Sequence, residues 1–142
     1  MPAFAVQQPD LRRVGPVVRM ALTIPADMEQ RLRERNEPIP QPVELQGMID
    51  TGATGNVIQE GLPAKLGLHP IGVSKIATAS SREVECFEYA VRFVFPSGVI
   101  VNDTAVEAPL QGQQIEALIG RGVLSLGTFV YLGYAGMFAF SI

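Results

Sequence analysis

The chain has 142 residues, of which 47% are hydrophobic and 18% charged, and its formal net charge is -3. This length and composition predict one globular domain with its own core, and they exclude a disordered chain and a two-lobed enzyme. Because nucleic-acid binding relies on clustered Lys and Arg, the slightly acidic charge gives no reason to expect a nucleic-acid partner.

Cysteine and histidine each occur once, as Cys86 and His69. Cys86 cannot form a disulfide within the chain, and the start at Met1 lacks the charged-then-apolar pattern of a signal peptide. We therefore expect a cytoplasmic, reducing setting. With one Cys and one His we expect no metal site of the zinc type, and we expect no cofactor. Cys86 is predicted to be a small buried hydrophobic residue.

The N-terminal part is predicted to contain a flexible leader, residues 1–14, before a domain that spans residues 15–142, because the first residues show no clear period. Residues 17–24 predict a strand by their β-branched content. Pro25 ends this strand and begins a predicted surface helix that reaches about Asn36. Three prolines then form an extended linker, since proline restricts its own backbone and that of the preceding residue.

An apolar strand, residues 43–49, enters the turn Asp50-Thr51-Gly52-Ala53. A second short strand is predicted at 56–58, followed by a short helix at 59–66. Taken alone, Asp-Thr-Gly is a common corner between a strand and a turn, because Asp and Gly are ordinary turn residues. From residue 71 to 106 the pattern is mostly β, with strands at 73–79, 84–95 and 99–106.

The segment after Arg121 is uncharged, and its length permits a membrane helix of about 20 residues. Three glycines and the absence of basic residues beyond the segment argue against such a helix. A short helix at 123–126 and two strands, 128–132 and 137–142, are favoured instead. We therefore expect no membrane partner.

Two motifs in this order resemble the retropepsin-like aspartic proteases, the single-domain relatives of the retroviral enzymes. The first is the apolar run that enters Asp50-Thr51-Gly52-Ala53, and the second is the run Ala117-Leu118-Ile119 that enters Gly120-Arg121. The resemblance covers roughly residues 43–142. It implies an all-β, retropepsin-like acid-protease barrel with ψ-loop motifs and one to three short helices.

The same resemblance implies a role for each residue of the site. Asp50 is the catalytic residue. Thr51 reaches the backbone of the other subunit, Gly52 offers its carbonyl to substrate, and Ala53 lines the pocket. The second motif, Ile119, Gly120 and Arg121, supports the catalytic turn from behind. The flap over the substrate comprises Ile76, Ala77, Thr78, Ala79 and Ser80.

Peptide hydrolysis by this route needs two adjacent carboxylates that share one proton. The other aspartates, Asp10, Asp27 and Asp103, lack a following Thr/Ser-Gly. The simplest resolution is a symmetric homodimer that pairs Asp50 with its copy. The expected function is thus an aspartic endopeptidase whose partners are its own copy and a peptide or unfolded protein substrate.

Two departures from the family pattern favour an alternative. Thr54 stands where retroviral relatives commonly have an aspartate that pairs with the later Arg, and Gly122 stands where an Asn or Asp usually follows that Arg. The alternative is a catalytically weak dimerisation or peptide-binding module with the same fold. A third interpretation is a monomer in which Asp50 is purely structural.

Overall fold

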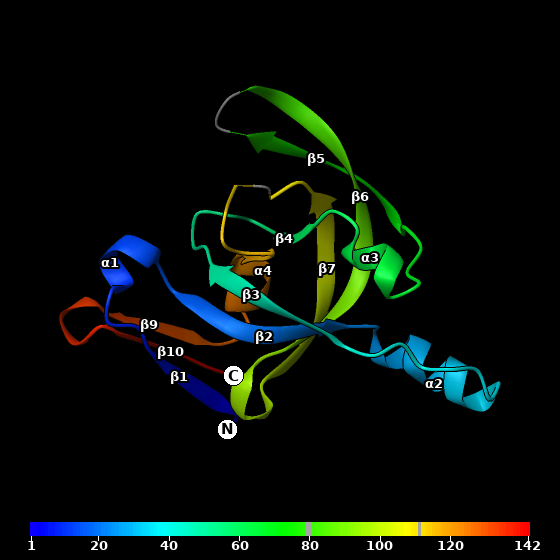
Figure 1. The fold of residues 1–142 in the computed structure, drawn as a ribbon, viewed down its shortest axis with the longest axis horizontal. Helices are drawn as coiled ribbons and strands as arrows, with labels where there is room; N and C mark the ends of the chain where they lie inside the picture. The colour runs from blue at the N-terminus through cyan, green and yellow to red at the C-terminus, as the bar shows by residue number, and fades with distance from the viewer. Residues whose placement is uncertain (79–80, 111) are drawn as a thin grey trace.

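Strands outnumber helices in the computed structural model, which describes residues 1–78, 81–110 and 112–142 (Figure 1). The strands are β1 (Ala3–Gln7), β2 (Val17–Thr23), β3 (Val43–Ile49), β4 (Asn56–Gln59), β5 (Gly72–Thr78), β6 (Ser81–Val94), β7 (Ile100–Ala108), β8 (Ala117–Ile119), β9 (Thr128–Leu132) and β10 (Met137–Ser141). The helices are α1 (Leu11–Val14), α2 (Ala26–Glu34), α3 (Leu62–Lys65) and α4 (Arg121–Leu124), with 3-10 turns at Pro96–Gly98 and Gly133–Ala135. The predicted all-β class is therefore confirmed.

The larger sheet has the strand order β2-β3-β8-β4-β7-β6-β5, and β2 pairs with β6 as well. This extra pairing, from Ala21 opposite Val94 to Thr23 opposite Arg92, curls the sheet into a barrel. The long strand β6 makes it possible, because it pairs with β7 and β5 over most of its length and with β2 at its end. The core fills the barrel, with Leu22, Val91 and Phe93 fully buried.

Strand β8 lies between β3 and β4, although β3 and β4 are joined directly by the Asp50 turn. It runs parallel to β3 and antiparallel to β4. This arrangement is the predicted ψ-loop. It brings the second motif, which includes β8 and the Gly120-Arg121 that follows it, beside a turn about 70 residues earlier in the chain.

A smaller sheet, β1-β10-β9, contains both ends of the chain (Figure 1). Where the sequence predicted a flexible leader over residues 1–14, the structure places β1 and α1, which bury Phe4 and Leu11. The ring of Phe4 stacks on Phe95 with centroids 5.5 Å apart and meets Phe140 edge-on. The sequence pattern missed this segment because β1 is short and gains its stability from packing on distant residues.

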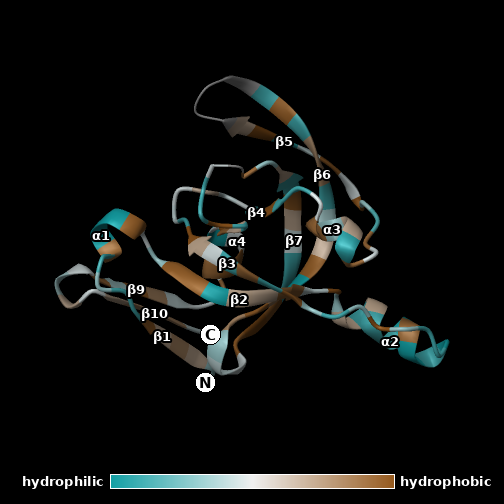
Figure 2. Ribbon diagram, viewed as in Figure 1, coloured by the Kyte–Doolittle hydropathy of each residue, from teal (hydrophilic) through white to brown (hydrophobic). Residues whose placement is uncertain are grey.

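Hydrophobic and hydrophilic residues alternate along β6, as Figure 2 shows. Tyr89, Val91, Phe93 and Phe95 face the core, as the sequence pattern indicates, whereas Phe87 is 54% exposed. Phe87 lies where β6 has left the barrel wall, and it pairs there with the exposed Val73 of β5.

The last part of the chain forms α4, β9 and β10, as the sequence analysis favoured. Within residues 1–78, 81–110 and 112–142, no helix has the length and apolar character needed to cross a bilayer.

Candidate active site

Asp50 directly follows β3, where the buried Ile49 ends the strand. Its backbone amide donates to the carbonyl of Ile119 at 2.8 Å, so β8 fixes the start of the turn. Its carboxylate oxygen Oδ1 accepts a hydrogen bond from the amide of Gly52 at 2.9 Å. The turn therefore sets the orientation of a carboxyl group that is partly open to solvent.

Gly52 and Ala53 complete the turn. A Cβ atom at Gly52 would lie 3.1 Å from Asp50 Oδ1, so a glycine gives the carboxylate the most room. The amide of Ala53 donates to the carbonyl of Asp50 at 3.2 Å. The structure thus gathers Asp50, Gly52 and Ala53 in one tight corner, as the motif predicts.

Arg121 supports this corner through both its backbone and its side chain. Its amide donates to the carbonyl of Ala53 at 2.8 Å. In its guanidinium group, Nη1 donates to the carbonyl of Thr51 at 2.8 Å and Nη2 donates to Oγ1 of Thr54 at 3.1 Å. Thr54 therefore supplies a hydroxyl acceptor in place of the aspartate that is common in retroviral relatives.

Gly120 makes the close approach between the two motifs possible. A Cβ atom at this position would lie 2.1 Å from the carbonyl oxygen of Gly55 and 2.9 Å from that of Ala53. Because both neighbours are backbone atoms, no side chain can be accommodated without moving the chain. Ile119, Gly120 and Arg121 thus all contact the Asp50 turn or the residues that follow it.

The sequence analysis did not identify two residues that contact each other beside the second motif, Asn56 and Asp103. Asn56 begins β4 and is only 3% exposed, and its side chain contacts Asp103 of β7 and the amide of Gly120. The only signal in the sequence is a polar residue at the start of an apolar strand, which is too common to be informative. Asp103 was considered only as a second catalytic carboxylate.

The predicted flap corresponds to the hairpin of β5 and β6, which extends beyond the rest of the barrel at the top of Figure 1. Ile76 packs against Cys86 and Val106, and Ala77 is exposed. Thr78 pairs with Ser81 after a register shift. The other two predicted flap residues, Ala79 and Ser80, lie outside the described residues.

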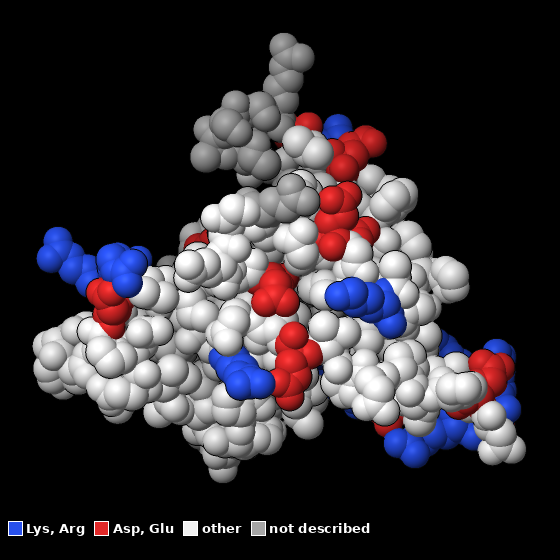
Figure 3. Space-filling model, viewed as in Figure 1, with Lys and Arg blue, Asp and Glu red and all other residues white. Residues whose placement is uncertain are grey.

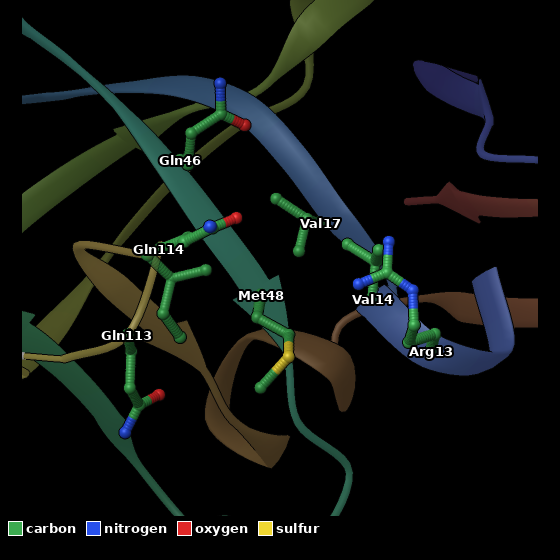
Figure 4. A pocket seen from close by; sticks show the side chains of 8 residues that line it. Arg13, Val14, Val17, Gln46, Met48, Gln113 and Gln114 are labelled. Carbon is green, nitrogen blue, oxygen red and sulfur yellow. The ribbon is translucent and has the colours of Figure 1, made fainter. Parts of the chain in front are cut away.

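A shallow groove begins beside β3, two residues before Asp50 (Figure 4). It is lined by Arg13, Val14, Val17, Gln46, Met48, Gln113, Gln114 and Ile115. Figure 4 shows Met48 between the N-terminal segment and the segment that leads into β8. Side chains of mixed polarity therefore flank the strand that delivers the aspartate.

Charged patches on one face of the molecule and metal-binding clusters among the described residues are two further kinds of candidate site. On the face drawn in Figure 3, Lys and Arg are scattered among acidic residues. In the part of the chain that the structure describes, no three His, Cys, Asp or Glu side chains lie close enough to hold a metal ion.

Cys86 is buried, as predicted, and burial raises the pKa of its thiol, with a smaller contribution from the charge of Glu107. Burial and the same Glu107 also raise the pKa of Tyr89, whose hydroxyl lies 3.2 Å from Glu107 Oε1. Both groups therefore remain protonated at neutral pH and are poor nucleophiles.

Comparison with known proteins identifies the family of this sequence. The sequence model described as aspartyl protease matches residues 36–123, which include both motifs. No curated protein matches the sequence significantly.

Structural comparison finds two solved structures with a similar fold. A retropepsin-like aspartic protease from Rickettsia conorii is similar over 97% of this chain and 89% of its own, with a TM-score of 0.55 and 13% identity. The foamy viral protease-reverse transcriptase, determined with an RNA/DNA hybrid, is similar over 82% of this chain and 12% of its own, with a TM-score of 0.54 and 18% identity. The chain thus belongs to the aspartyl protease family and has the retropepsin-like fold.

Proposed function

We propose that the protein is an aspartic endopeptidase that acts as a homodimer, with Asp50 of each copy forming the catalytic dyad. The observation that carries this proposal is the turn at Asp50, which β8 and Arg121 hold from behind while the carboxyl group stays partly open to solvent. Because the motif occurs once in the chain, the second carboxylate comes from a second copy.

In the proposed mechanism, one Asp50 carboxylate takes a proton from a water molecule while the other, protonated, donates its proton to the carbonyl oxygen of the peptide. The water oxygen forms a bond to the carbonyl carbon, which gives a gem-diol. The carboxyl group that took the water proton then donates it to the amide nitrogen, the carbon–nitrogen bond breaks, and the other carboxylate takes a proton from the diol, so that a carboxylic acid and an amine leave and the dyad is restored. Two carboxylates about 3 Å apart cannot both ionise, so the pair shares one proton and favours activity on the acidic side of neutral.

In this proposal the substrate is an extended peptide that lies between the β5–β6 hairpin and the aspartates and adds main-chain hydrogen bonds in the manner of a strand. Gly52 offers its carbonyl to this peptide, and Thr51 contacts the partner copy. The groove beside Met48 is a candidate place for substrate side chains.

The direct test is the Asp50→Asn variant, which keeps the size of the side chain and removes its acid-base chemistry. We expect no cleavage of unfolded proteins between acidic and neutral pH, with an unchanged circular dichroism spectrum. Activity per chain of the wild type should fall on dilution, because a dimer dissociates. Residual cleavage by Asp50→Asn, or cleavage at a concentration where sedimentation shows only monomer, would contradict the proposal.

Thr54 and Gly122 favour the second candidate, a dimerisation or peptide-binding module with little catalysis. A panel of unfolded proteins incubated with and without a transition-state-mimicking aspartic protease inhibitor separates the two. Cleavage that the inhibitor blocks identifies the enzyme, and peptide binding without cleavage identifies the module. Sedimentation that shows only monomer at every concentration would support a structural role for Asp50.

A further inference from the structure

The buried side chain of Asn56 links three parts of the molecule. Its Nδ2 donates to Oδ2 of Asp103 at 2.8 Å and to the carbonyl of Thr104 at 2.9 Å. Its Oδ1 accepts from the amide of Gly120 at 2.9 Å. One side chain thus connects β4, β7 and the second motif.

These contacts fix the orientation of the amide group. Both Nδ2 protons have an acceptor, and the opposite oxygen has a donor, so a flipped Asn56 would place like groups against each other. In the interior such a fully satisfied polar group is rigid, because any movement leaves a buried donor or acceptor without a partner.

Asp103 is held equally firmly. Its Oδ1 accepts from the amide of Thr104 at 2.8 Å, while Oδ2 accepts from Asn56. A Cβ atom at Gly122 would lie 2.9 Å from Oδ2, which cannot move away without losing the bond to Asn56. The Asp103 carboxylate therefore occupies the space that a side chain at position 122 would need, which accounts for the glycine there.

We propose that Asn56 and Asp103 are positioning residues for the catalytic turn. Asn56 fixes Gly120, the flanking Ile119 accepts from the amide of Asp50, and Arg121 donates to Ala53. A shift of Gly120 is therefore passed to Asp50 through backbone hydrogen bonds. This inference rests on the proposed function, because it assigns these residues to the reaction of Asp50.

The first test is the Asn56→Ala variant, assayed below its unfolding temperature. Misplacement of a catalytic group by about 1 Å can cost roughly 100-fold in rate. We expect kcat to fall by about 10- to 100-fold on that basis, with KM changed less than about twofold, because no substrate contact is removed. The matched control is Thr23→Ala. Thr23 is the other buried polar residue among those that the structure describes, but it lies on β2 and not beside the second motif. Wild-type kcat in Asn56→Ala, or an equal loss in Thr23→Ala, would overturn the inference.

The second test uses the contact between Gly122 and Asp103. Gly122→Ala should lower kcat in the wild-type background, because the new methyl group displaces the Asp103 carboxylate. In the Asp103→Ala background the same change should cost little further, since the space is already free. Such non-additivity is expected only when two residues act through one contact. Equal losses in both backgrounds would contradict the inference.

A third measurement separates failure of the inference from failure of the proposed function. In Asn56→Ala, hydrogen exchange at the amides of Gly120 and Asp50 should accelerate at least tenfold relative to wild type, whether or not the protein cleaves peptides. Unchanged exchange at both amides refutes the positioning role. Where Asn56→Ala does not fold, Asp103→Asn supplies the same readouts, because it keeps the size of the side chain but leaves one acceptor oxygen for two donors, Asn56 Nδ2 and the amide of Thr104.

Discussion

The guanidinium group of Arg121 lies 2.8 Å from the backbone carbonyl of Thr51, a residue 70 positions earlier in the chain. Its other terminal nitrogen donates to the hydroxyl of Thr54. The side chain of Arg121 therefore binds both Thr51 within the Asp50 turn and Thr54 just after it. This contact adds to the backbone hydrogen bonds that join the two motifs, from Asp50 to Ile119 and from Arg121 to Ala53.

Replacing Arg121 by Ala should destabilise the protein by about 1.5–3 kcal/mol, the typical contribution of a hydrogen bond that involves a charged group. The backbone bonds of the turn remain, so we expect the variant to fold and to cleave more slowly. Urea unfolding and cleavage rates check this. Arg121→Lys serves as the control for charge, since a lysine keeps the charge and lacks the planar fork that reaches Thr51 and Thr54 together.

Thr54→Asp should add a charged acceptor for Arg121. Because both side chains are exposed, the expected gain in the free energy of unfolding is only about 0.2–1 kcal/mol. The gain should shrink at high salt, which screens exposed pairs. A loss of stability at low salt would show that the hydroxyl of Thr54 is the better partner.

Gly120→Ala should be far more harmful than a similar change nearby. The new Cβ would lie 2.1 Å from the carbonyl oxygen of Gly55, and we expect a loss of at least about 3 kcal/mol or failure to fold. Gly55→Ala is the matched control, because a Cβ at Gly55 meets no atom within 4 Å. Thermal unfolding of the two variants compares them, and equal melting temperatures would contradict the close approach.

Part of the loss of stability of the folded protein in acid should come from protonation of Glu29. Hydrogen bonds from Arg33 and then Arg92 hold the pKa of its carboxyl below the ordinary value of 4.5. In the window below pH 4.5 the unfolded chain binds this proton before the folded chain does. The stability that Glu29 contributes is thus present above pH 4.5 and is lost as the pH falls through the lowered pKa.

The Glu29→Gln variant should therefore lose stability at neutral pH and depend less on pH in the acidic window than the wild type. Urea unfolding at pH 7 and at several points below pH 4.5 measures the difference. Glu37→Gln, in the exposed segment after the same helix, is the control and should follow the wild type. A Glu29→Gln curve parallel to that of the wild type would refute the assignment.

The thiol of Cys86 should react slowly in the folded protein, because burial raises its pKa and limits access. A thiol-specific reagent at pH 8 should label it at a rate set by opening of the structure, and labelling in urea should be much faster. Equal rates in both conditions would show that the thiol is exposed.

Much of the fold was predictable because its strands have local patterns. The predicted strand at 43–49 coincides with β3, and the predicted helix from Pro25 to Asn36 contains α2. The segment of β1 was missed because only Phe4 and Val6 face the core, and these are too few to produce a period. Its structure depends on pairing with β10 at the other end of the chain.

The residues of the site that stand in a sequence motif could be predicted. The residues that only strand pairing brings into contact could not. Asp50 and Arg121 stand in recognisable runs, and the structure brings them together. Asn56 and Asp103 are 47 positions apart and stand in no motif, and only the parallel pairing of β4 and β7 brings them into contact. Single-sequence patterns carry no information on such pairings.

The placement of β8 between β3 and β4 means that the Asp50 turn depends on residues near position 120. A nascent chain that ends at Leu110 already contains Asp50, yet it lacks the strand that fills the gap in the sheet and the arginine that closes the turn. Long-range pairings of this kind form late and slowly. The carboxyl group of Asp50 can therefore reach its final geometry only once the chain as far as Arg121 is present, because Ile119 and Arg121 hold the turn.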